Sequence, residues 1–91
     1  MSERFNNVWD AISDSPAEAE NMKMRSVFMM AIKQFADSQE GTQADKAERL
    51  GLTQPRLNDL LKGRIGKFSL DSLVNIAAKA GLAISVDVKA A

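Results

Sequence analysis

Residues Thr42 to Arg64, TQADKAERLGLTQPRLNDLLKGR, carry the strongest structural signals in the sequence. The hydroxyl of Thr42 can cap the amides of a first helical turn, and Asp45, three residues later, completes a capping box. Gly51 can adopt the positive φ that a sharp turn after a helix demands. The sequence therefore predicts a short helix that begins at Thr42 and ends near Leu50 in a tight turn.

A second short helix is predicted directly after this turn. Thr53 can cap it, and Pro55 falls within its first turn, where a missing amide hydrogen costs nothing. Leucines at helical spacing face inward and polar residues face outward. The inner set is Leu57, Leu60 and Leu61, and the outer set is Gln54, Arg56, Asn58, Asp59 and Lys62. Two amphipathic helices joined by a tight turn are the pattern of a helix-turn-helix, whose second helix enters the major groove of DNA.

Further helices are predicted on both sides of this pair. Ser15 and Pro16 mark a helix start, because serine caps helices and proline is favoured at the first position. No helix breaker follows until about Ser38. Roughly 22 helical residues span about 33 Å, so the first half of this helix is long enough to project and to serve a partner. Another helix begins after Ser69 and stops at Gly81.

The two ends of the chain have different patterns. Residues 1–14 include the apolar residues Phe5, Val8, Trp9 and Ile12. Their spacing fits either a helical turn or an extended arm. We expect this arm to pack on the body of the protein or on a neighbour. Within residues 82–91, four apolar residues alternate with small or charged ones, as in a half-buried strand: Leu82, Ile84, Val86 and Val88.

A lone strand needs a partner for its backbone hydrogen bonds. Either the N-terminal arm or the same strand of a second copy could supply them, and the poor alternation from Arg4 to Trp9 favours the second copy. A strand paired across a two-fold axis would also place two recognition helices on a two-part DNA site.

The composition excludes several classes of protein. Ninety-one residues are enough for one domain, and the chain contains neither cysteine nor histidine. Disulfides, thiolate chemistry, most zinc sites and the commonest general base are therefore absent, and we expect no catalytic residue, metal or cofactor. No apolar run approaches the roughly 18 residues of a membrane span, and no targeting signal opens the chain, so a cytoplasmic location without membrane contact is expected.

The net charge is zero, but the charge is unevenly distributed. Residues 1–40 carry four basic and seven acidic groups, whereas residues 41–91 carry eight basic and five acidic groups. Between residues 52 and 70, four basic residues accompany Asp59 as the single acidic one. This polarity is expected of a small protein that reads DNA, although an ordinary solvated face would have the same composition.

The motif resembles a known family. The run Thr42-Gln43, Ala47, Leu50-Gly51-Leu52-Thr53, Leu57, Leu60 and Gly63 is similar to the Cro/C1-type (XRE) helix-turn-helix of phage repressors. The similarity extends to short XRE regulators that include HigA-type antitoxins through Gly63-Arg64, Lys67-Phe68-Ser69 and the segment from Leu73 to Gly81. The chain departs from the family at Gly41, where an apolar residue is usual, and at Lys46, where the family often has an apolar or small one.

The resemblance implies an all-α, five-helix, lambda-repressor-like helix-turn-helix domain, and the alternating residues after Gly81 add a C-terminal β-strand that is expected to pair across a dimer. The chain would divide into an arm (residues 1–14), a helical domain (residues 15–81, with the motif at 42–63) and a strand with its tail (residues 82–91).

Each polar position of the motif has an expected role. Gln54 can pair with adenine and Arg56 with guanine, while Asp59 can accept from cytosine N4 or pair with Arg56. The predicted base-reading set is Gln54, Pro55, Arg56, Asn58 and Asp59. The predicted phosphate-binding set is Thr42, Gln43, Thr53, Lys62, Arg64 and Lys67, the last by resemblance. The predicted dimer interface is Leu82, Ile84, Val86 and Val88.

The sequence thus favours a transcriptional regulator, a repressor that binds double-stranded DNA as a homodimer. The HigA-type resemblance implies a sharper version, an antitoxin that binds a small ribosome-dependent RNase toxin and represses its own operon. Acidic residues near the N-terminus would suit a basic toxin: Asp10, Asp14, Glu18 and Glu20. The alternative is a protein-interaction module that kept the fold without binding DNA, and zero net charge with Asp59 in the reading face motivates it. An enzyme is not expected.

Overall fold

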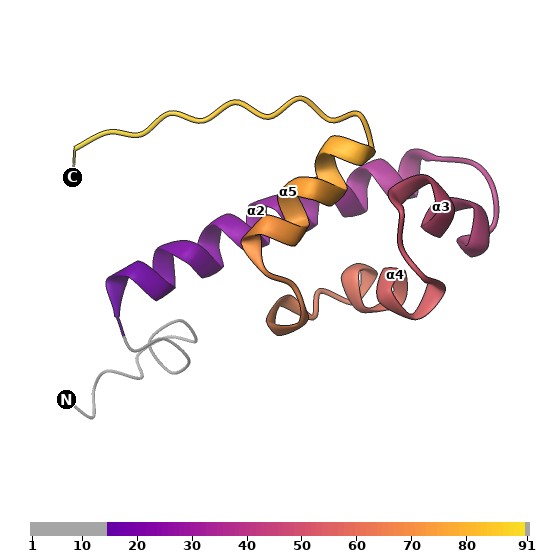
Figure 1. Cartoon of the computed structure of the whole chain (residues 1–91), viewed down its shortest axis with the longest axis horizontal. Helices are drawn as coiled ribbons and strands as arrows, with labels where there is room; N and C mark the ends of the chain where they lie inside the picture. Colours follow the sequence, from indigo (N-terminus) through magenta and orange to yellow (C-terminus); the bar gives the residue numbers. More distant parts are fainter. Residues whose placement is uncertain (1–14, 91) are drawn as a thin grey trace.

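The computed structural model describes residues 15–90. Over this range the chain forms α-helices and one short 3-10 helix (Figure 1). In chain order they are α2 (Pro16–Ser38), α3 (Gln43–Leu50), α4 (Gln54–Leu61), η2 (Ile65–Lys67) and α5 (Leu70–Lys79). Within this range, no helix has both the length and the apolar character that crossing a membrane requires.

Each of the four α-helices within residues 15–90 begins at a hydroxyl cap that the sequence predicts. The side chains of Ser15, Thr42, Thr53 and Ser69 each accept a hydrogen bond from the amide three residues further on. These bonds satisfy amides that lack a partner inside the helix, and together they define where the helices start.

The helices enclose one apolar core. α2 packs against α5, α4 and η2, while α3 packs against α4 and α5. The largest fully buried side chains come from α2, α4, α5 and the linker before α5: Phe68, Ile32, Leu57, Leu60 and Leu73. The helix-turn-helix pair is therefore seated on a scaffold made of α2 and α5.

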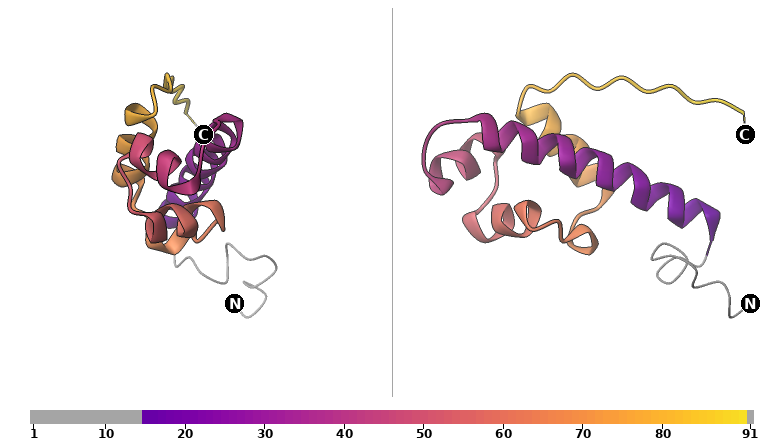
Figure 2. Two further views of the ribbon diagram at one scale, coloured as in Figure 1. Left: turned by 90° about the vertical axis from the view of Figure 1, so that its right-hand side faces the viewer. Right: turned by 180° about the vertical axis from the view of Figure 1, so that it is seen from behind.

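The first turns of α2 extend past α4 and η2, and the chain after α5 runs back along α2 toward that same end (Figures 1 and 2). Residues 82–90 form this extended, mostly exposed segment, which we call the tail.

The predicted C-terminal strand is wrong. The tail contains no strand, and within residues 15–90 no other extended segment lies beside it to form a ladder. Alternating apolar residues predict which side chains share a face, but a strand also needs the N–H and C=O groups of a neighbour. Over the described residues, the five-helix domain with a paired strand is replaced by an all-α helix-turn-helix arrangement of four α-helices and η2. The predicted N-terminal arm lies outside the described residues.

Candidate nucleic-acid interface

The turn between α3 and α4 is built from backbone hydrogen bonds. Gly51 adopts the left-handed conformation, with φ of 71° and ψ of 30°. Its N–H donates to the carbonyl of Glu48 over 3.0 Å, and the N–H of Leu52 donates to Ala47 over 2.8 Å. Thr53 then caps α4. The chain thus closes one helix and starts the next within three residues, as a helix-turn-helix requires.

The outer face of α4 presents three of the five predicted base-reading residues to solvent. Gln54, Pro55 and Asn58 are exposed. α4 contains eight residues, so it is about 12 Å long, a length that a major groove about 12 Å wide admits. Gln54 and Asn58 carry amide groups of the kind that pair with an adenine edge.

Arg56 is engaged within the protein. Its guanidinium lies over the ring of Phe68, with Cζ 4.0 Å from the ring centroid. One of its terminal nitrogens donates to the carbonyl of Lys67. The residue predicted to read guanine therefore contacts the segment that follows α4.

Asp59 is paired with Arg64, not with Arg56 as the sequence allowed. Nη1 of Arg64 lies 2.8 Å from Oδ1 of Asp59. The Asp59 side chain is 18% exposed and that of Arg64 is 48% exposed. A predicted base reader and a predicted phosphate ligand thus neutralise each other at the end of α4.

The remaining predicted phosphate ligands fall into two groups. The hydroxyl oxygens of Thr42 and Thr53 accept amide hydrogen bonds as helix caps. Gln43, Lys62 and Lys67 are exposed. Lys62 follows the last residue of α4 and Lys67 is the last residue of η2, and these two elements follow one another along one edge of the molecule (Figures 1 and 2).

The acidic groups near the motif have structural roles. The backbone amide of Thr42 donates to the Asp45 carboxylate over 3.0 Å. This hydrogen bond, together with a hydrogen bond from the Thr42 side chain, holds the pKa of the Asp45 carboxyl below its ordinary value of 3.8. The carboxylate therefore stays ionised as one half of the predicted capping box. Across residues 15–90, no three acidic side chains gather where they could hold a metal ion.

Sequence reasoning missed Arg25 of α2. Nη1 of this arginine donates to the carbonyls of Ile65, over 3.3 Å, and Phe68, over 3.1 Å. A signal was present, because Arg25 shares a helical face with Met29 and Ile32, which are four and seven residues further on and are buried. A charged residue on the same helical face as core residues indicates a hydrogen-bond partner on a neighbouring segment.

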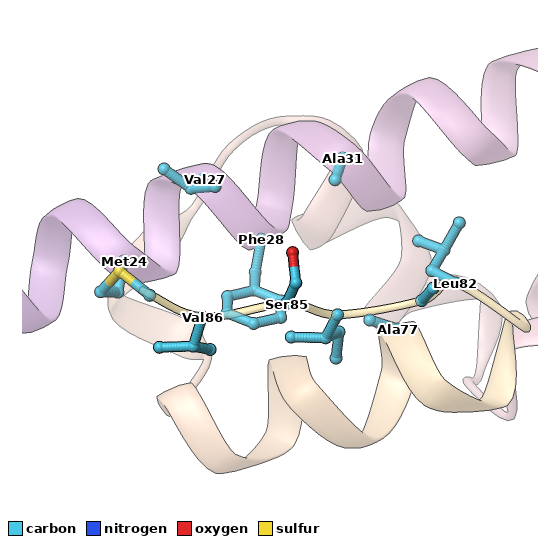
Figure 3. Close-up of a pocket in the computed structure, with 10 residues that line it drawn as sticks. Met24, Val27, Phe28, Ala31, Ala77, Leu82, Ser85 and Val86 are labelled. Atoms are coloured by element: carbon cyan, nitrogen blue, oxygen red, sulfur yellow. The ribbon is translucent and has the colours of Figure 1, made fainter. Parts of the chain in front are cut away.

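A second surface lies between α2 and the tail (Figure 3). It is an open apolar pocket of about 240 Å³, lined on the α2 side by Met24, Val27, Phe28 and Ala31. Three of the four predicted dimer residues, Leu82, Ile84 and Val86, line it from the tail. Val88, the fourth, is not part of the pocket lining and is exposed.

The comparisons with known proteins agree with this architecture. A family model described as a helix-turn-helix domain matches residues 11–89, which is nearly the whole chain. No curated protein matches the sequence. The match spans the capped α3–turn–α4 unit together with α2 and α5, and the chain therefore belongs to the helix-turn-helix family of DNA-binding domains.

Proposed function

We propose that this protein is a transcriptional repressor of the Cro/C1-type (XRE) class, which binds a specific DNA operator as a homodimer in the cytoplasm and has no enzymatic activity. The observation that carries the proposal is the exposed outer face of α4, where the amide side chains of Gln54 and Asn58 are exposed and form no hydrogen bond with the side chains of other described residues. Exposed Lys62 directly follows α4, and exposed Lys67 is linked to α4 by the hydrogen bond from Arg56 to its carbonyl, so both can supply charge for phosphates.

The reading face also explains why a chain with zero net charge can bind DNA. Asp59 is paired with Arg64, and Asp45 is bound in its capping box. Neither carboxylate therefore presents an isolated negative charge beside Lys62 and Lys67. The local balance of charge at the edge, rather than the sum over the chain, determines attraction to the phosphates.

Selection of duplexes from a random DNA library at two salt concentrations tests the proposal. We expect enrichment of an inverted repeat whose half-sites lie about one helical turn apart. Gln54→Ala should change the preferred base at one position of each half-site. Gln34→Ala, which alters an exposed glutamine on α2, is the matched control and should leave the preference unchanged. If no duplex is enriched, the DNA reading fails and the alternative, a protein-interaction module, takes its place.

A finer proposal is that the repressor is a HigA-type antitoxin. The support from the structure is the projecting start of α2, where Glu18 and Glu20 are exposed and Glu20 pairs with Lys23 over 3.1 Å. A basic partner would fit the acidic side chains of this surface. Co-expression with the product of an adjacent small reading frame tests it: a stable complex that Glu18→Lys with Glu20→Lys disrupts supports an antitoxin, and absence of a complex contradicts it.

A further inference from the structure

Two arginines, one from α2 and one from α4, donate hydrogen bonds to the segment that follows α4. This segment, residues 64–68, contains η2 and ends at Phe68, and we call it the α4–α5 loop. Arg25 of α2 donates to the carbonyls of Ile65 and Phe68. Arg56 of α4 donates to the carbonyl of Lys67. Three backbone carbonyls of one short loop are therefore bound by guanidinium groups.

The contacts make the loop and the arginines depend on each other. Nε of Arg25 is buried without a hydrogen-bond partner among the described residues. Its charge is stabilised in the protein by the two loop carbonyls, since hydrogen bonds to a charged group are stronger than neutral ones. Arg56 is fixed by a carbonyl on one side and by the Phe68 ring on the other. Phe68 is itself 2% exposed, so the loop is anchored in the core.

The consequence for DNA binding concerns Lys67. Its carbonyl is held by Arg56 while its side chain is exposed. A phosphate ligand on a fixed backbone loses less conformational entropy on binding than one on a free loop. Arg56, in contrast, would have to give up both the Lys67 carbonyl and the Phe68 ring before its planar fork could pair with guanine.

We propose that Arg25 and Arg56 are positioning residues, and that Arg56 acts on DNA through the placement of Lys67 and not by reading a base. The DNA part of this inference rests on the proposed function. The structural part, a loop fixed by two arginines, does not depend on DNA and can be measured in the free protein.

The free protein is tested with Arg25→Lys and Arg56→Lys, which keep the charge but lose the planar fork. Circular dichroism establishes that each variant is folded. We expect the amide resonances of residues 65–69 to shift in both variants, and the hydrogen-bonded amides of Ile65, Lys67 and Phe68 to exchange about tenfold faster. Gln54→Ala, at an exposed position of the same helix as Arg56, is the control and should leave these amides unchanged. Unaltered loop amides in both arginine variants would overturn the clamp.

The effect on DNA is tested by a double-mutant cycle between Arg56→Lys and Lys67→Ala on the selected duplex. If Arg56 acts through Lys67, the double variant has the same affinity for the duplex as the single variant that binds more weakly. Each single variant should also reduce the slope of log K against log salt by about 1. The preferred sequence should stay the same. Additive losses would show that Arg56 contributes to DNA binding independently of Lys67, and a changed base preference in Arg56→Lys would show that Arg56 reads a base; either result overturns the proposal.

The measurements on the free protein and on the DNA complex distinguish failure of this inference from failure of the proposed function. If the unaltered protein binds no duplex, the repressor proposal and the DNA part of this inference fail together. The exchange rates of the loop amides then still decide whether the two arginines fix the loop.

Discussion

Asp59 and Arg64 form a pair whose charges cancel beside the proposed reading face. The pair is partly exposed, so it adds little to stability, and on the proposed function Asp59 would compete with a phosphate for Arg64. We expect Asp59→Asn to release Arg64 and remove a negative charge near the DNA. Affinity should rise for all duplexes, and the plot of log K against log salt should steepen by about 0.9, the value for one added phosphate contact. Fluorescence anisotropy over a salt series measures both.

The matched control for this prediction lies in the tail. Asp87 and Lys89 form a similar exposed ion pair, 3.4 Å apart, away from α4. Asp87→Asn should leave the salt slope unchanged. If Asp59→Asn instead alters the preferred base at one position, then Asp59 reads cytosine, as the sequence allowed, and the prediction is wrong.

Asp45 should make the stability of α3 depend on pH. Hydrogen bonds from Thr42 lower the pKa of its carboxyl in the folded protein from 3.8. A lowered folded pKa means that the stabilisation is present above the unfolded value and is lost as pH falls through the folded one. Asp45→Asn should therefore be less stable than the unaltered protein at neutral pH, with the difference disappearing well below pH 3.8. Urea unfolding at several pH values measures this.

Asp71→Asn is the control for the capping box. Asp71 is an exposed carboxylate in the first turn of α5, where Ser69 caps the helix without a reciprocal acidic partner among the described residues. A difference that persists unchanged at low pH for Asp45→Asn would contradict an ionised cap.

At the scale of elements, two glycines end helices in the same conformation with different surroundings. Gly51 closes α3 with φ of 71°, and Gly63 follows α4 with φ of 73°. An alanine at either position should cost about 1 kcal/mol, because the left-handed region disfavours a Cβ atom. Only the Cβ at Gly51 would meet a neighbour, the flexible side chain of Lys79 at 3.0 Å.

Thermal unfolding of four variants separates the two contributions. Gly63→Ala should lose only the stability that the left-handed backbone costs an alanine. Gly51→Ala should lose the same amount and a small further amount from the contact with Lys79. That addition should vanish in the double variant with Lys79→Ala, measured against Lys79→Ala by itself. A neutral or stabilising Gly51→Ala would contradict the backbone argument.

The helices could be predicted from sequence because their boundaries are set locally. Thr42, Thr53, Ser69 and Gly51 act within three or four residues of their own positions, and the structure has each in its predicted role. Contacts between elements were not predictable in this way. Nothing local places Arg56 over Phe68, twelve residues away, or Arg25 against a loop about forty residues later.

The tail shows the limit of periodicity. Leu82, Ile84 and Val86 alternate as a strand does, and they do share a surface, since all three line the pocket with α2. Ala83 and Ser85 line the same pocket, however, so the alternation does not separate two faces of the tail. Nor could the pattern establish a hydrogen-bonding neighbour, which a strand requires.

On the scale of the whole molecule, the projecting part is placed where a second copy could bind without covering α4. The start of α2 and the end of the tail extend past α4 and η2 at one end of the molecule (Figure 1). A two-fold axis through that end, parallel to the direction in which α4 faces, would leave both α4 helices on the same side, as a two-part DNA site requires. The exposed apolar residues of these two segments are Met24, Val27, Met30, Ile84, Val86 and Val88. We therefore propose that the homodimer forms through side-chain contacts of this surface.

Val86→Asp tests the dimer proposal, because Val86 lines the pocket and is 66% exposed in the single chain. A carboxylate there would be desolvated in the dimer but solvated in the monomer, so dimerisation should weaken at least about tenfold. Asn75→Asp, which adds the same charge to the exposed side of α5 outside the pocket, should have no effect. Sedimentation velocity over a concentration series gives the association state.

Binding to duplexes with one or with two half-sites measures how dimerisation affects DNA affinity. We expect Val86→Asp to bind a single half-site as the unaltered protein does, and to lose the additional affinity that a second half-site provides. A Val86→Asp protein that remains dimeric would move the interface elsewhere, and an unaltered protein that is monomeric at every concentration would contradict the homodimer itself.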